Sequence, residues 1–184
     1  MKKILIFIML LHSIYAHSEA FGNKIISLPT FGFEFIDSIA LNNKKPLGIS
    51  YDYLIGAKFA AAFDYDWYWI SQSHVSFGPM SQTKKILSSI NAGSGVKYNF
   101  SEQDIRPYAA LLINYLQFLG KAATELKNLE GWPIFVGLSS EIGLEWIFVD
   151  ELSVSLGVDY GFYVNIHKPI NHLLSFKSAF NIYF

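Results

Sequence analysis

The chain has 184 residues, with 14 basic and 15 acidic side chains and no cysteine. This length suits one domain, the formal net charge of −1 offers no basic excess for nucleic acid, and the lack of cysteine excludes disulfides and cysteine-linked lipids. Charged residues make up only 16% and aromatic residues 17%, which is an unusually apolar composition for an exported soluble domain.

The first segment reads as a secretory signal. Lys2 and Lys3 precede a continuously apolar run over 4–11, and Ser18 and Ala20 place small residues at the positions that a signal peptidase reads. The run is less than half of the roughly 20 residues that a spanning helix needs. We therefore predict a signal peptide over 1–20 and one barrel domain over 21–184.

Alternation with period 2 dominates the remaining chain. From Leu152 to Val164 every even position is apolar or aromatic, while the odd positions are mostly Ser and Gly with Asp159 among them. The same pattern upstream predicts eight strands, over 28–38, 47–57, 61–72, 87–100, 105–118, 132–148, 152–166 and 172–184.

The connections alternate in length. Those over 39–46, 73–86 and 119–131 are long, and helix formers in the third predict a short helix there. Those over 58–60, 101–104 and 149–151 are short. The pattern leaves the boundary near 58–60 and the register of 105–118 open. It predicts an all-β fold, an eight-stranded antiparallel up-and-down transmembrane β-barrel with short periplasmic turns and longer outer loops.

Alternation alone does not show which face of such a barrel meets water and which meets lipid. A lipocalin-like soluble barrel covers its outside with polar residues, but here the less apolar face consists mainly of small residues and lacks the Lys and Glu coat of a soluble surface. We therefore place Leu156 and Val158 outward and Asp159 inward, and expect Leu156→Arg to be costly and Gly157→Ser mild. The outward aromatic residues near strand ends are expected to form interfacial belts; they are Trp67, Trp69, Tyr98, Phe100, Trp146 and Tyr160.

The chain ends in "SAFNIYF", with Phe180, Ile182 and Phe184 on one face of the last strand. With the signal, the strand count and the loop asymmetry, this ending resembles the small outer-membrane β-barrel proteins of diderm bacteria, the OmpA/OmpX/OmpW-like group. The resemblance implies an outer-membrane location. It also implies that the barrel-assembly machinery reads the terminal aromatic pattern at these three positions.

The small face, taken as the lumen, carries more acids than bases. A charge in so narrow an interior must be paired or hydrated. We interpret the set as a structural polar network that fills the tube; the alternative is a narrow channel for small hydrophilic or cationic solutes. The predicted inward charges are Glu34, Asp52, Asp64, Asp66, Glu141, Glu145 and Asp159, with Lys58, Lys97 and Lys177.

No arrangement for catalysis is evident. Glu141 and Glu145 lie about 13 Å apart along one strand, too far for the roughly 5–9.5 Å of a hydrolytic carboxylate pair. His172 and Ser175 are three positions apart and so on opposite faces of a strand, unlike the His and Ser two apart in outer-membrane lipid A deacylases. His74 and His167 fall in or beside predicted outer loops. We expect no catalytic residue, cofactor or metal. A lipid-modifying enzyme is therefore ranked third, after the structural role and the channel.

The predicted outer loops are basic and the short turns acidic. A basic outer rim would face the phosphates of lipopolysaccharide. We therefore expect a monomer with a structural or surface-interaction role, in envelope integrity, lipopolysaccharide contact or adhesion, and no nucleic-acid partner. The loop lysines are Lys44, Lys45, Lys84, Lys85, Lys121, Lys127 and Lys168, against Glu125 and Glu130.

Overall fold

A computed structural model of the chain describes residues 24–38, 48–64, 66–79, 86–101, 103–119, 134–165 and 168–184. The predicted signal peptide, the predicted helix after residue 120, His167 and all the loop lysines except Lys168 lie outside these ranges. The strands are β1 (Lys24–Ser38), β2 (Gly48–Ala62), β3 (Trp67–Pro79), β4 (Ile86–Asn99), β5 (Ile105–Leu119), β6 (Ile134–Val149), β7 (Leu152–Asn165) and β8 (Lys168–Tyr183).

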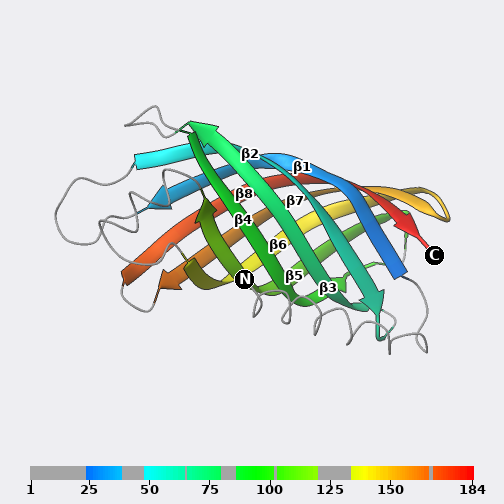
Figure 1. The fold of residues 1–184 in the computed structure, drawn as a ribbon. Coiled ribbons are helices and arrows are strands. Elements are labelled where there is room, and N and C mark those ends of the chain that lie inside the picture. The colour runs from blue at the N-terminus through cyan, green and yellow to red at the C-terminus, as the bar shows by residue number, and fades with distance from the viewer. Residues whose placement is uncertain are drawn as a thin grey trace, which may run out of the picture.

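The eight strands form a closed antiparallel barrel, which confirms the predicted fold class (Figure 1). Each strand pairs with the next, and β1 also pairs with β8. At this seam the Lys24 amide donates to the Phe184 carbonyl at 2.9 Å, and the Phe184 amide donates back to the Lys24 carbonyl at 3.0 Å. The last residue therefore closes the ladder, so the closing strand presents no open edge along this seam.

The strands are strongly staggered. Directly paired residues lead from Ile25 on β1 around the barrel to Leu173 on β8 and from there to Ile36, eleven residues further along β1. Such a stagger requires strands tilted by roughly 35–45° against the barrel axis. An eight-stranded barrel of this kind leaves an interior just wide enough for side chains to fill.

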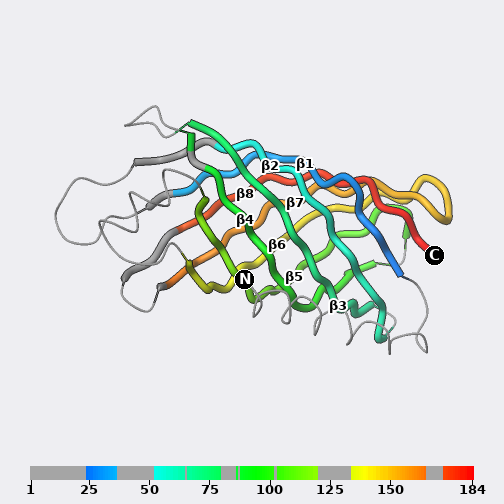
Figure 2. Tube along the Cα trace, in the orientation of Figure 1, coloured from blue at the N-terminus to red at the C-terminus, as the bar shows by residue number. Residues whose placement is uncertain are grey.

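Three short connections, 63–66, 100–104 and 150–151, lie at one end of the barrel, here called the turn end. Figure 2 shows the start of β1 and the end of β8 side by side at the same end. The Phe63 amide donates to the Trp67 carbonyl at 3.0 Å, and the Phe100 amide donates to the Pro107 carbonyl at 2.9 Å, which closes two of these turns. The opposite end is called the loop end.

The predicted boundary between the second and third strands is wrong. Residues 58–60 lie inside β2, because they contain no turn-forming residue and continue its alternation, and the chain reverses at 63–66, which holds Asp64 and Asp66. The predicted long connection over 73–86 is also too long, since 73–79 belong to β3. His74 is therefore a strand residue and not a loop residue.

The face of large apolar side chains lies on the outside of the barrel, as predicted. Leu156 is 61% exposed, whereas Asp159 is fully buried. The structure also settles the register of β5, in which Leu111 and Ile113 point outward and Leu112 inward. Within the described residues, no helix is long and apolar enough to cross a membrane.

Aromatic side chains gather near both ends of the outer surface. At the turn end the Trp67 ring packs at a tilt against Tyr98 with ring centroids 4.8 Å apart, and Tyr98 meets Phe100 edge-on at 5.0 Å. At the loop end Phe77 lies 6.3 Å from Tyr53. Trp67 and Phe77 are ten residues apart on β3, which is about 33 Å along a strand and, with the tilt, close to the ~25 Å apolar band of outer-membrane barrels.

Candidate functional site: the barrel interior

The interior is filled with paired charges and with two clusters of apolar side chains. The seven residues predicted for a polar network are all buried in the lumen: Glu34, Asp52, Lys97, Glu141, Glu145, Asp159 and Lys177. Asp64 and Asp66 are not, because they lie in the β2–β3 turn, where Asp64 is exposed. The described interior therefore holds five carboxylates against Lys58, Lys97, Lys177 and His74, a smaller acidic excess than the sequence predicted.

Glu145 is the centre of a cluster in the turn-end half. Its Oε2 accepts from Lys97 Nζ at 2.8 Å. Its Oε1 accepts from Ser153 Oγ at 2.5 Å, from Asn181 Nδ2 at 2.9 Å and from Tyr183 Oη at 2.5 Å. Donors from β4, β7 and β8 thus replace the water that this carboxylate loses on burial.

Glu141 lies two inward positions before Glu145 on β6, with Gly143 between them, and has its own partners. Lys58 Nζ donates to its Oε1 at 2.6 Å, and Tyr108 Oη donates to the same oxygen at 2.8 Å. Lys177 Nζ is 3.8 Å from its other oxygen, Oε2. The two glutamates therefore have different ion-pair partners.

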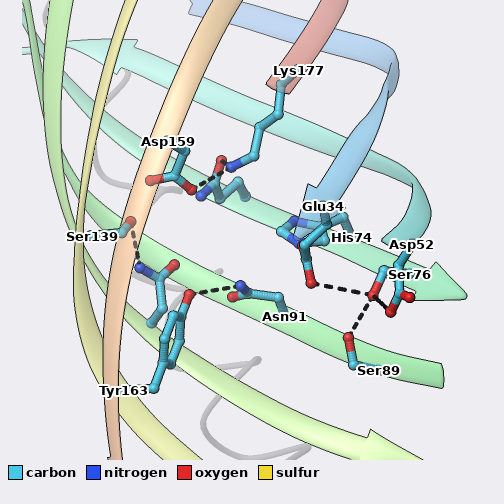
Figure 3. Close-up of polar contacts among 12 residues, drawn as sticks. Glu34, Asp52, His74, Ser76, Ser89, Asn91, Ser139, Asp159, Tyr163 and Lys177 are labelled. Atoms are coloured by element: carbon cyan, nitrogen blue, oxygen red, sulfur yellow. Dashed lines mark hydrogen bonds and ion pairs between the residues drawn. The ribbon is translucent and has the colours of Figure 1, made fainter. Parts of the chain in front are cut away.

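Lys177 connects this cluster to Asp159. Its Nζ donates to Asp159 Oδ2 at 2.6 Å and lies 3.4 Å from Gln72 Oε1 across the lumen. Figure 3 shows the lysine side chain reaching from β8 to the aspartate on β7. One ammonium group thus contacts β7, β6 and β3, which ties separate parts of the wall together.

Tyr108 occupies a slot made by two glycines. Gly143 and Gly157 are direct partners on β6 and β7. A Cβ on Gly143 would lie 2.5 Å from the Tyr108 ring and hydroxyl, and one on Gly157 would lie 2.6 Å from the hydroxyl. Lys97 Nζ sits 4.5 Å from the centre of the same ring, a cation–π distance. The small residues of the alternation pattern therefore make room for large inward side chains.

A third polar cluster lies in the loop-end half (Figure 3). His74 Nε2 is 2.9 Å from Glu34 Oε2, and Ser76 Oγ donates to Glu34 Oε1 at 3.3 Å. Ser76 also lies 3.5 Å from Asp52 Oδ2 and 2.7 Å from Ser89 Oγ. The sequence reading missed His74 and Ser76, although both continue the inward parity of Tyr68 and Ile70, because it ended the third strand at residue 72.

Apolar and neutral polar side chains fill the remaining lumen. Asn91 Nδ2 donates to Tyr163 Oη at 2.8 Å, and Asn114 Nδ2 donates to Ser139 Oγ at 2.8 Å. A cavity of about 10 Å³ beside Lys97 has room for about one water molecule. The turn-end apolar cluster comprises Ile25, Ala60, Tyr68, Ile70, Ala110, Leu112 and Tyr183, and the loop-end one comprises Ile36, Leu116, Phe118, Phe135, Tyr163 and Leu173.

The remaining residues considered for chemistry are not brought together. Ser175 is buried in the lumen, whereas the His172 ring stacks on the outward-facing Tyr160, so the two lie on opposite faces of β8. Within the described ranges, no three His, Asp or Glu side chains are placed to hold a metal ion. Phe180, Ile182 and Phe184 face outward at the turn end, and their reading by the assembly machinery stays a prediction.

No protein-family model and no curated protein sequence matches this chain. Several solved structures do match its fold. Neisserial surface protein A has a TM-score of 0.65 over 88% of this chain and 98% of its own, at 11% identity. OprG of Pseudomonas aeruginosa has a TM-score of 0.58, with 89% and 96% covered, at 14% identity. The outer-membrane enzyme PagL has a TM-score of 0.56, with 86% and 98% covered, at 13% identity.

The fold and these matches define the class: the chain is a small eight-stranded barrel like those of bacterial outer-membrane proteins. At 11–14% identity the likeness shows the fold alone. Because one of these three proteins is an enzyme, the fold does not decide between a catalytic and a non-catalytic role.

Proposed function

We propose that this protein is an integral outer-membrane barrel, exported through a signal peptide over 1–20, that acts as a structural or surface-interaction protein. The observation that carries this proposal is the cross-bridged interior. The bond from Lys58 to Glu141 joins β2 to β6, which are four strands apart and so on opposite sides of an eight-stranded barrel. A lumen crossed by buried ion pairs behaves as a core, which leaves the outer surface and the loops to carry function.

The proposed surface role is contact with lipopolysaccharide, envelope integrity or adhesion. Its support is the basic composition of the predicted loops, set against acidic turns at the other end. A fixed anionic lipid surface would attract such a rim. The protein is proposed to act as a monomer, since its barrel closes on its own strands.

Conductance tests the filled interior. Planar-bilayer recordings of the refolded wild type are expected to show no steady current. Lys177→Met is expected to lower the free energy of unfolding in urea by about 3–5 kcal/mol, because it leaves buried carboxylates without their ammonium partner, while conductance stays near zero. A steady cation-selective current through the wild type would instead establish the runner-up, a narrow channel for small hydrophilic or cationic solutes.

Assembly tests the proposed partner during biogenesis. Phe184→Asp is expected to lower the amount of folded, heat-modifiable barrel in the outer membrane. The matched control is Phe100→Asp, since Phe100 is also exposed at the turn end, at 61% against 62% for Phe184, but lies within the chain. A loss much larger for Phe184→Asp supports recognition of the terminal strand by the assembly machinery, and equal losses would contradict it.

A further inference from the structure

A small cavity lies in the turn-end half of the lumen, beside the ion pairs of Glu141 and Glu145. Its volume is about 10 Å³. Every strand except β3 contributes to its wall, so the cavity belongs to the interior of the barrel and not to one part of the sheet. The lining residues are Ile25, Ser27, Lys58, Ala60, Lys97, Tyr108, Glu145, Ser155 and Asn181.

The size and the polarity of this cavity limit what it can hold. A volume of about 10 Å³ suits one water molecule and nothing larger. Apolar cavities of proteins stay dry, whereas a water is held where two to four polar groups can hydrogen-bond to it. The polar groups of the wall therefore decide whether the cavity binds a water.

Two lysine side chains line the cavity and come from different ion pairs. Lys58 pairs with Glu141, and Lys97 pairs with Glu145. Both ammonium groups face the ring of Tyr108, with Nζ of Lys58 5.8 Å and Nζ of Lys97 4.5 Å from its centre. An ammonium group has three N–H donors, and the ion pair uses one of them in each lysine. Further N–H groups of both lysines can therefore donate to an acceptor in the cavity.

Two serine hydroxyls supply acceptors in the same wall. Ser27 on β1 is the direct partner of Lys58 on β2, and Ser155 on β7 is the direct partner of Glu145 on β6. Both serines are buried in the lumen. Because a hydroxyl can accept as well as donate, a water in this cavity has two donors and two acceptors available, enough for the roughly three hydrogen bonds of a typical buried water.

The charges around the cavity favour a neutral occupant. The carboxylate of Glu145 is part of the wall and would repel a small anion. The ammonium groups of Lys58 and Lys97 would repel a cation. Since each lysine already has its own carboxylate partner, these two ion pairs leave no net charge for an ion to neutralise.

We propose that this cavity binds one water molecule, which accepts hydrogen bonds from Lys58 and Lys97 and donates to the hydroxyls of Ser27 and Ser155. The proposal rests on the filled interior proposed above and names a neutral ligand that this interior holds. The oxygen of the water lies between two like charges, so its dipole reduces their repulsion. The two ion pairs are thereby joined by hydrogen bonds through the water.

Contacts between water and the lysine ammonium groups test the proposal. The refolded full-length barrel, with isotope-labelled lysine, is studied in detergent micelles by nuclear Overhauser transfer from water. Rotating-frame measurements separate a bound water from proton exchange, and Lys58→Met and Lys97→Met assign the two signals. The wild type is expected to show a long-lived water at both lysines.

Ser155→Thr keeps the hydroxyl and adds one methyl group, which takes up the space of the water. The water signals at Lys58 and Lys97 are expected to disappear together. Ser175→Thr is the matched control, since Ser175 is a fully buried lumen serine that does not line this cavity, and it is expected to keep both signals. If Ser155→Thr does not fold, Ser27→Thr makes the same test from β1.

A wild type without a bound water, a water at one lysine alone, or signals that survive the added methyl group would overturn the proposal. A shift of the lysine signals when chloride is exchanged for sulfate would also overturn it, because an anion would then occupy the cavity. A barrel that does not conduct and lacks this water loses only this inference. A steady current through the wild type would instead overturn the filled interior.

Discussion

Two buried glutamates in the same lumen are held in different ways. Glu145, in the turn-end half, pairs with the ammonium of Lys97 and accepts three further hydrogen bonds from neutral side chains. Glu34, in the loop-end half, is hydrogen-bonded to His74 and Ser76 in the described part of the chain. Both side chains are fully buried, so burial alone does not distinguish them.

The partners distinguish them. Lys97 and Glu145 form a buried ion pair, in which each charge offsets part of the cost of removing the other from water. A histidine can be neutral and still hydrogen-bond, and a serine is always neutral. The turn-end half therefore holds its buried carboxylate with a lysine, whereas the loop-end half holds Glu34 with a histidine and a serine.

The largest expected effect is that of Glu145→Gln. It leaves the buried Lys97 ammonium without its carboxylate and should cost about 3–5 kcal/mol of unfolding free energy. Urea titration of the barrel in lipid vesicles measures it. The double variant Glu145→Gln with Lys97→Met removes both charges and should recover part of the loss. A single-variant loss below about 1 kcal/mol, the value of an ordinary neutral hydrogen bond, would remove the difference between the two halves.

Leu156→Arg tests the assignment of the two faces of β7, on which the comparison of buried charges depends. Leu156 is exposed on β7, and its neighbours Ser155 and Gly157 face inward. A charge on the lipid face near the midplane should cost about 2–4 kcal/mol, falling toward the interfaces. Val164→Arg, placed nearer the loop end on the same strand and also exposed, is the control and should cost less. Equal and negligible losses in vesicles would mean that this face does not meet lipid.

Gly157→Ser tests the slot that brings Tyr108 to the ion pairs. From the alternation alone this change is mild. The structure predicts a cost of about 1–3 kcal/mol, because the new Cβ would collide with the Tyr108 hydroxyl that donates to Glu141. Combining it with Tyr108→Ala should remove the collision, so that the glycine substitution costs little in that background. Full additivity in a double-mutant cycle of unfolding free energies would contradict the slot.

Glu34→Gln has the smallest expected effect, about 1 kcal/mol or less. The amide can still hydrogen-bond to His74 and Ser76, and no permanent cation loses its partner. Measured beside Glu145→Gln in the same vesicles, it gives a matched isosteric pair. A loss as large as that of Glu145→Gln would contradict the difference drawn between the two clusters.

The barrel and its inward face were predictable because alternation with period 2 is a local property of each strand. Leu156 outward and Asp159 inward follow from neighbours in the sequence, and so does the inward placement of Lys97 and Lys177. The turn at 63–66 was missed because residues 58–60 carry no signal against continuing the strand. The same error displaced His74 into a loop and Asp64 into the lumen.

The amino-acid sequence by itself determined the apolar, charge-poor composition, the number of strands and which face of each strand is apolar. These properties depend on residue type and on whether a position is odd or even within its strand. Only the tertiary structure decided which charges meet. The register of eight staggered strands brings Lys58 to Glu141 across the lumen and leaves His74 with Glu34, and this register depends on contacts that are far apart in the chain. The space for Tyr108 is decided in the same way, since two glycines on neighbouring strands must lie opposite each other before a third strand can fill the gap.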